Sequence, residues 1–167
     1  MNNRILITYA TRTGSTAEVA EAIGEVLASR GFVVDIKPMK EKPSLDRYNA
    51  VVLGSAIRLG SWVTEALDFI KENQARLNQI PTAIFTVHML NTGDNESSRA
   101  ARQAYINPVR QLITPEAEAF FAGNLDLAKL SFVDRVITKL VAAETGPKVG
   151  DFREWEKIRD WAHKVLE

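Results

Sequence analysis

The chain has 167 residues, of which 46% are hydrophobic and 25% are charged, as expected for a single globular domain covering residues 1–167. Its 21 lysines and arginines balance its 21 aspartates and glutamates, which gives no reason to expect nucleic acid as a partner. It contains no cysteine, which excludes disulfides, thiol redox chemistry and cysteine-ligated iron–sulfur clusters.

The first predicted elements are a strand over Arg4–Tyr9 and a helix over Ser15–Ser29, joined by a loop rich in hydroxyl groups. The loop and helix start contain Thr11, Arg12, Thr13, Gly14, Ser15 and Thr16. Free N–H groups at a helix start and the helix dipole favour an anion there, and hydroxyls can donate hydrogen bonds to it. The loop has neither a GxxxxGK[ST] nor a GxGxxG pattern, so a phosphomonoester fits better than a triphosphate or a dinucleotide. A capped helix start without a ligand is the alternative interpretation.

The rest of the chain alternates between strand and helix patterns. Gly31 ends the first helix, and we predict the following elements in order: strands Phe32–Ile36 and Ala50–Leu53, helix Thr64–Arg76, strand Thr82–Val87, a helix near Ser97–Leu112, strand Ala117–Ala122 and helix Phe152–Leu166. This order predicts an α/β domain whose parallel sheet is covered by helices on both faces.

The first loop resembles the flavodoxin loop that holds the phosphate of FMN. Tyr9, Thr11, Gly14 and Thr16 match the aromatic, hydroxyl, small and threonine positions of that loop, whereas Thr8 stands where an apolar residue is usual. The resemblance implies FMN as cofactor and a doubly wound, flavodoxin-like sheet of five parallel strands in the order 2-1-3-4-5.

The resemblance also implies that two further loops bind the cofactor. After the third strand these residues are Ser55, Ala56, Ile57, Arg58, Leu59, Gly60 and Trp62, and after the fourth they are Thr86, Val87, His88 and Met89. We expect Gly54 and Gly60 to bracket a loop in which residues 55–58 face the ring. Trp62 either stacks on the flavin or seals a helix against the sheet; Arg58 either stabilises the reduced, anionic flavin or is solvated. His88 either exchanges protons or is a hydrogen-bonded structural residue, and no histidine spacing indicates a metal site.

The pattern after the fifth strand predicts a helical insertion over about Leu127–Gly150, in which Phe132, Val136 and Leu140 share one apolar face. This face either packs against the domain, lines a substrate site, or meets a partner or membrane surface through residues 130–143. The insertion, with the segments Val51–Gly60 and Phe132–Leu140, is similar to the flavodoxin-fold subgroup of menaquinone-dependent protoporphyrinogen oxidases.

Two functions stay open from the sequence. The first is an FMN-dependent oxidoreductase that passes electrons from an organic, protoporphyrinogen-like substrate to a quinone-like acceptor, with the flavin supplying the chemistry and no catalytic side chain identified. The second is an electron carrier that serves a redox protein partner. A phosphoacceptor regulator is rejected, because Thr11–Ser15 and Gly54–Ser55 replace the acidic residues it needs. No apolar run reaches the roughly 20 residues of a membrane span, so we expect a cytoplasmic protein, with contact at the inner face of the membrane as an alternative.

Overall fold

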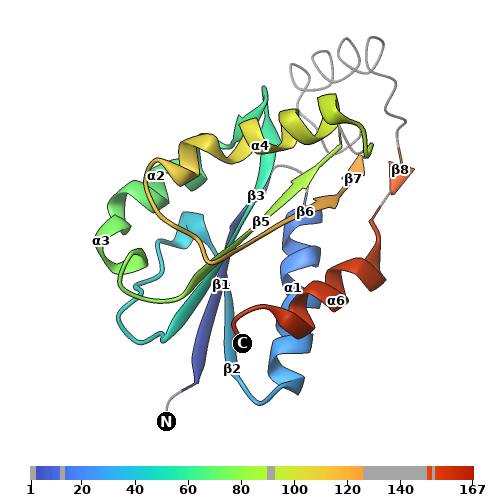
Figure 1. The fold of residues 1–167 in the computed structure, drawn as a ribbon. Coiled ribbons are helices and arrows are strands. Elements are labelled where there is room, and N and C mark those ends of the chain that lie inside the picture. Colours follow the sequence, from blue (N-terminus) through green and yellow to red (C-terminus); the bar gives the residue numbers. More distant parts are fainter. Residues whose placement is uncertain (1–2, 12–13, 90–92, 126–149, 152) are drawn as a thin grey trace.

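The computed structural model describes residues 3–11, 14–89, 93–125, 150–151 and 153–167. A central sheet lies between two layers of helices (Figure 1). Its parallel strands are β1 (Arg4–Ala10), β2 (Val33–Pro38), β3 (Ala50–Arg58), β5 (Thr82–His88) and β6 (Ala117–Ala122). They lie in the order β2-β1-β3-β5-β6, which confirms the predicted order 2-1-3-4-5 and the α/β fold class.

The helices divide between the two faces of the sheet. Helices α1 (Ser15–Ser29) and α6 (Trp155–Lys164) cover one face, and α2 (Thr64–Glu72), α3 (Gln74–Leu77) and α4 (Glu96–Arg110) cover the other (Figure 1). Alternate β1 residues enter the two cores, with Ile5 and Ile7 on the α1 side and Leu6 on the α2 side. The central strands β1, β3 and β5 are therefore largely buried on both faces, as in parallel sheets generally, whereas the edge strands β2 and β6 are only partly buried.

The third strand differs from its prediction, because it extends five residues beyond Leu53 to Arg58. Residues Gly54 and Ser55 pair with the end of β1, and Ser55 and Ala56 pair with β5. The chain then turns back into the short antiparallel strand β4 (Ser61–Trp62). The expected loop between Gly54 and Gly60 was wrong over most of its length. Ser55 pairs with both β1 and β5, Ala56 pairs with β5, and Ile57 and Arg58 pair with β4 in a hairpin.

Other elements also differ from their predictions. The expected helix Thr64–Arg76 is broken at Asn73, whose side-chain amide donates to the carbonyl of Phe69 at 2.9 Å. A short 3-10 turn, η1 (Met39–Glu41), follows β2. The last helix is shorter at both ends than Phe152–Leu166.

The predicted insertion lies almost wholly outside the described residues. Two short strands flank it: β7 (Asn124–Leu125) pairs antiparallel with β8 (Gly150–Asp151). The expected helical face and the contact through residues 130–143 therefore remain predictions. Within the described ranges, no helix is both long and apolar enough to cross a membrane.

A polar network ties the amino-terminal half of the sheet to the neighbouring segments. The Tyr48 hydroxyl donates to the Asp35 carboxylate at 2.7 Å, Arg4 reaches the same carboxylate at 3.4 Å, and Arg76 donates to the Tyr48 carbonyl at 2.9 Å. The hydrogen bond from Tyr48 is the main cause that lowers the pKa of Asp35. The hydrogen bond and positive charge of Arg4 lower it further. Burial, assisted by Asp35, raises the pKa of the Tyr48 phenol.

Candidate flavin-binding site

The strand register brings the predicted site segments to one edge of the sheet. Ala10 at the end of β1 pairs with Ser55 of β3, and Ser55 pairs with Thr86 of β5. The carboxyl ends of neighbouring parallel strands are where ligands bind in open α/β sheets. The three segments chosen from the sequence thus meet at a common edge.

The first loop is prepared for an anion by its backbone. Gly14 precedes α1 in a left-handed conformation (φ 93°), which glycine adopts without steric penalty. Its N–H donates to Thr11 Oγ1 at 3.0 Å. Within the described residues, no side chain caps the start of α1, so its first N–H groups remain available to a ligand. Arg12 and Thr13 lie outside the described residues, and their predicted contacts stay predictions.

Thr16 carries the most informative single atom of the site. Its side chain is fully buried in the first turn of α1, and among the residues that the structure describes its Oγ1 has no hydrogen-bond partner. A buried hydroxyl without a partner costs about 1–3 kcal/mol, and such groups are rare in native proteins. A phosphate oxygen at the helix start would satisfy it, and the neighbouring Ser15 and Thr11 hydroxyls supply two further groups. The residues present therefore fit the phosphate of FMN.

The second predicted segment uses its polar side chains internally. Ser55 Oγ accepts from the Val63 N–H at 3.2 Å, and the Trp62 indole N–H donates to Thr86 Oγ1 at 2.9 Å. Trp62 is only 2% exposed and packs in the core with Phe69 and Ile70 of α2. Of its two interpretations, this burial agrees with sealing α2 against the sheet, because a stacking ring must present a face to the ligand.

The tip of the β3–β4 hairpin is the exposed part of this segment. Leu59 and Gly60 both have positive φ, 52° and 78°, as a two-residue hairpin turn requires. Leu59 is 75% exposed, and Arg58 beside it is also exposed. Ala56 and Ile57 are partly buried against the core. A leucine is strained in this conformation, and its exposure leaves it available to an apolar ligand surface.

The third predicted segment divides between the two faces of the sheet. Val87 belongs to the core beneath α1. His88 is 5% exposed on the other face, where its ring lies 5.7 Å from that of Tyr105 and 6.0 Å from that of Phe120. This packing agrees with a structural histidine, one of its two predicted roles.

Gly123 is a residue of this edge that the predicted site omitted. A Cβ at this position would lie 2.7 Å from Val87 Cγ1, and 3.5 Å from both Met89 Sδ and Ser15 Oγ. Glycine therefore allows the chain leaving β6 to approach the start of α1. Its place in a turn after an apolar strand was the available sequence signal, but nothing in the sequence indicated Ser15 as its neighbour.

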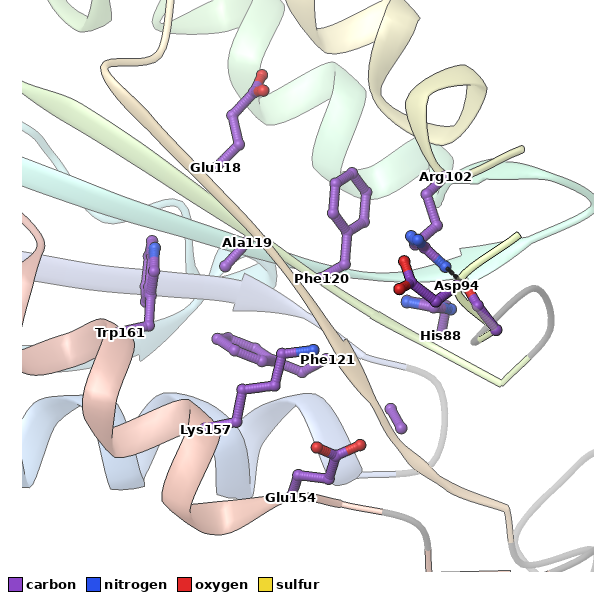
Figure 2. Close-up of a pocket in the computed structure, with 12 residues that line it drawn as sticks. His88, Asp94, Arg102, Glu118, Ala119, Phe120, Phe121, Glu154, Lys157 and Trp161 are labelled. Carbon is purple, nitrogen blue, oxygen red and sulfur yellow. Dashed lines mark hydrogen bonds between the residues drawn. The ribbon is translucent and has the colours of Figure 1, made fainter. Parts of the chain in front are cut away.

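A groove of about 500 Å³ runs beside His88, along β6 and between α4 and α6. Figure 2 shows His88, Phe120 and Arg102 on one side of β6, and Phe121, Lys157 and Trp161 on the other. Arg102 donates to the carbonyl of Gly93 at 2.6 Å. The groove thus adjoins the end of β5 and combines aromatic with charged walls.

Comparison with known proteins agrees with the flavodoxin-like sheet order of the structure. Residues 6–149 match a family described as "Flavodoxin domain". The protoporphyrinogen IX dehydrogenase [quinone] of Escherichia coli (strain K12) is 26% identical over 173 residues, covering 97% of this chain and 94% of the relative. The protein of the same name from Leishmania major is 27% identical over 170 residues, covering 95% of this chain and 73% of the relative.

Solved structures are similar in fold. A short-chain flavodoxin associated with a PDU bacterial microcompartment has a TM-score of 0.59 at 16% identity, covering 98% of this chain and 96% of that one. A flavodoxin from the domain Archaea has a TM-score of 0.52 at 17% identity, with coverages of 93% and 99%.

Proposed function

The chain belongs to the flavodoxin family, and on that premise we propose that it is an FMN-dependent oxidoreductase that passes electrons from an organic substrate to a quinone-like acceptor. The observation that carries the cofactor assignment is the buried, unpartnered hydroxyl of Thr16 at the uncapped start of α1. One terminal phosphate satisfies this geometry. A flavin dinucleotide would instead need a site for a pyrophosphate.

In this proposal, the residues at the sheet edge divide the work of holding FMN. Thr11, Ser15, Thr16 and the first N–H groups of α1 bind the phosphate. The hairpin tip at Arg58–Gly60 and the chain around Met89 flank the ring. Gly123 keeps the approach to Ser15 open, because a larger residue there would collide with Val87.

The bound flavin supplies the electron transfer itself. The protein binds it, fixes its orientation and sets the charge around it. The guanidinium of Arg58 favours negative charge on a ring nearby, and the exposed apolar side chain of Leu59 shields one side of the ring from water. Trp62 contributes indirectly, since its hydrogen bond to Thr86 fixes the base of the hairpin to β5.

The relatives support an enzyme over a simple carrier. Proteins named protoporphyrinogen IX dehydrogenase [quinone] align with 95–97% of this chain. We therefore propose a protoporphyrinogen-like donor and a quinone acceptor. The carrier reading makes a different experimental prediction, because a carrier is reduced only by a protein partner.

The test begins with apoprotein titrated with FMN, FAD and riboflavin, with flavin fluorescence as the readout. We expect one FMN per chain and weaker binding of the other two. The FMN-loaded protein is then mixed anaerobically with protoporphyrinogen IX, and a soluble menaquinone analogue is added after reduction. Bleaching of the flavin absorbance by the donor and its return with the quinone support the proposal; no binding of FMN, or no reduction by the donor, contradicts it.

A further inference from the structure

An ion pair joins the first turn of α1 to the segment that precedes α6. Arg153 Nη1 contacts Glu18 Oε2, and the Arg153 side chain is only 7% exposed, whereas that of Glu18 is 47% exposed. The Arg153 guanidinium also lies over the ring of Trp155, 4.6 Å from its centroid. The two residues are 135 positions apart in the sequence. Their ion pair places a nearly buried cation beside the start of α1.

The carboxylate of Glu18 lies where it would disfavour the binding of an anion at the start of α1. Its N–H donates to the carbonyl of Gly14 at 3.3 Å, so Glu18 belongs to the same first turn as Thr16 and the uncapped N–H groups. A carboxylate there is stabilised by the helix dipole. For the same reason it competes with a phosphate for that dipole, and the two negative charges repel each other.

We propose that Arg153 is a positioning residue for the phosphate site: it neutralises and holds Glu18, so that the start of α1 can accept the dianionic phosphate of a flavin. The proposal rests on the proposed function and deepens it, because it explains how the start of α1 can accept a phosphate although the carboxylate of Glu18 already lies in its first turn. Burial of Arg153 and its stacking on Trp155 fix the cation in place, since a desolvated guanidinium over an indole ring is strongly held.

The Arg153–Glu18 ion pair could instead have a purely structural role. It would fasten the α6 segment to α1, and its loss would lower the stability of the fold and weaken every flavin alike. The phosphate role makes a separate claim about charge, namely that the loss of Arg153 is harmful only while Glu18 keeps its carboxylate. Riboflavin and the Glu18→Gln substitution distinguish the two roles.

The experiment measures dissociation constants of FMN and riboflavin for apoprotein carrying Arg153→Met, Arg153→Lys, Glu18→Gln, or Arg153→Met with Glu18→Gln. Arg110→Met is the matched control, because Arg110 forms an ion pair with Glu118 on β6 without contacting α1. Melting temperatures of the apoproteins report stability separately. Each titration is done at low salt and at high salt.

We expect Arg153→Met to weaken FMN by roughly fivefold and to leave riboflavin unchanged, the scale of a charge at the first turn of a helix. Arg153→Lys should retain most of the FMN affinity, Glu18→Gln should tighten FMN by about two- to fivefold, and the double variant should return close to the wild type. High salt should reduce all these differences.

Equal weakening of both flavins by Arg153→Met, or an unchanged FMN affinity in Glu18→Gln, overturns the inference while leaving FMN binding intact. The Glu18→Gln variant keeps this test valid even where Arg153→Met fails to fold. A wild-type protein that shows no preference for FMN over riboflavin overturns the proposed cofactor as well.

Discussion

The two ends of the parallel sheet use their polar groups differently: side chains toward the amino ends form a network within the protein, whereas at the carboxyl ends no described side chain caps the start of α1. Toward the amino ends, Arg4, Asp35, Tyr48 and Arg76 each make at least one hydrogen bond within the protein, although Nε of each arginine has none. At the carboxyl ends, the Thr16 hydroxyl is buried without a partner and the start of α1 is uncapped. The positive-φ residues Gly14, Leu59 and Gly60 also lie at this end.

This difference separates groups that stabilise the fold from groups that await a ligand. Buried polar groups that bind one another contribute to folding, whereas an unpartnered one costs free energy until something else satisfies it. The carboxyl edge is not uniform, because Trp62 and Thr86 there satisfy each other. The comparison therefore predicts which substitutions affect binding and which affect stability.

The largest effect is expected from Thr11→Ala combined with Thr16→Ala. Each charge-assisted hydrogen bond to phosphate is worth roughly 1.5–3 kcal/mol, so the pair should weaken FMN by more than about a hundredfold and riboflavin far less. Fluorescence titration of both flavins measures the difference. Equal losses would show that neither hydroxyl touches the phosphate.

Thr8→Val is the control for that experiment. Thr8 is also fully buried with an unpartnered Oγ1, but within β1, at the position where the flavodoxin resemblance leads us to expect an apolar residue. This substitution should preserve FMN affinity and raise the free energy of unfolding by about 1 kcal/mol.

Trp62→Phe should act on stability and leave flavin binding nearly unchanged, even though Trp62 lies near the binding edge. Loss of packing volume and of the bond to Thr86 should lower the free energy of unfolding by roughly 2 kcal/mol. Urea unfolding of the apoprotein gives this value. A large loss of FMN affinity with unchanged stability would return Trp62 to the role of a stacking residue.

Asp35→Asn tests the amino-terminal network through pH. The folded pKa of Asp35 is lowered, so its ionised form is stabilising above its ordinary pKa near 3.8, and that contribution is lost as the pH falls through the lowered value. At pH 7 the substitution should cost about 1 kcal/mol. Thermal unfolding between neutral and acidic pH should show a smaller decline for the variant, with FMN affinity unchanged at pH 7.

Leu59→Asn should give the smallest change in stability. Asparagine tolerates a positive φ better than leucine, so the apoprotein should gain about 0.5 kcal/mol. FMN affinity should fall slightly, because an apolar contact with the ring is lost. Stabilisation without any change in flavin binding or spectrum would place Leu59 outside the site.

Much of the fold, and the position of the hydroxyl loop at the start of α1, could be predicted from the sequence. Apolar runs and alternation predicted the parallel strands and their helices, because burial on both faces leaves a continuous hydrophobic pattern. The helix Ser15–Ser29 was predicted with its exact bounds, directly after the hydroxyl-rich loop. This was possible because the strand, the loop and the helix follow one another in the sequence. The contact of the loop with phosphate is the part that the double threonine substitution will test.

Only the tertiary structure decided how the other segments are used. Ser55 and Trp62 look like ligand residues in sequence, yet the sheet continues past Ser55 because β1 and β5 both offer backbone partners. Trp62 is instead buried and bonded to Thr86. Likewise Gly54 is required by the ring of Phe85, whose Cζ would lie 2.0 Å from an added Cβ. The Glu18–Arg153 pair and the approach of Gly123 to Ser15 join distant parts of the chain. Such contacts depend on how strands and helices are placed in space, and a local pattern carries no information about that placement.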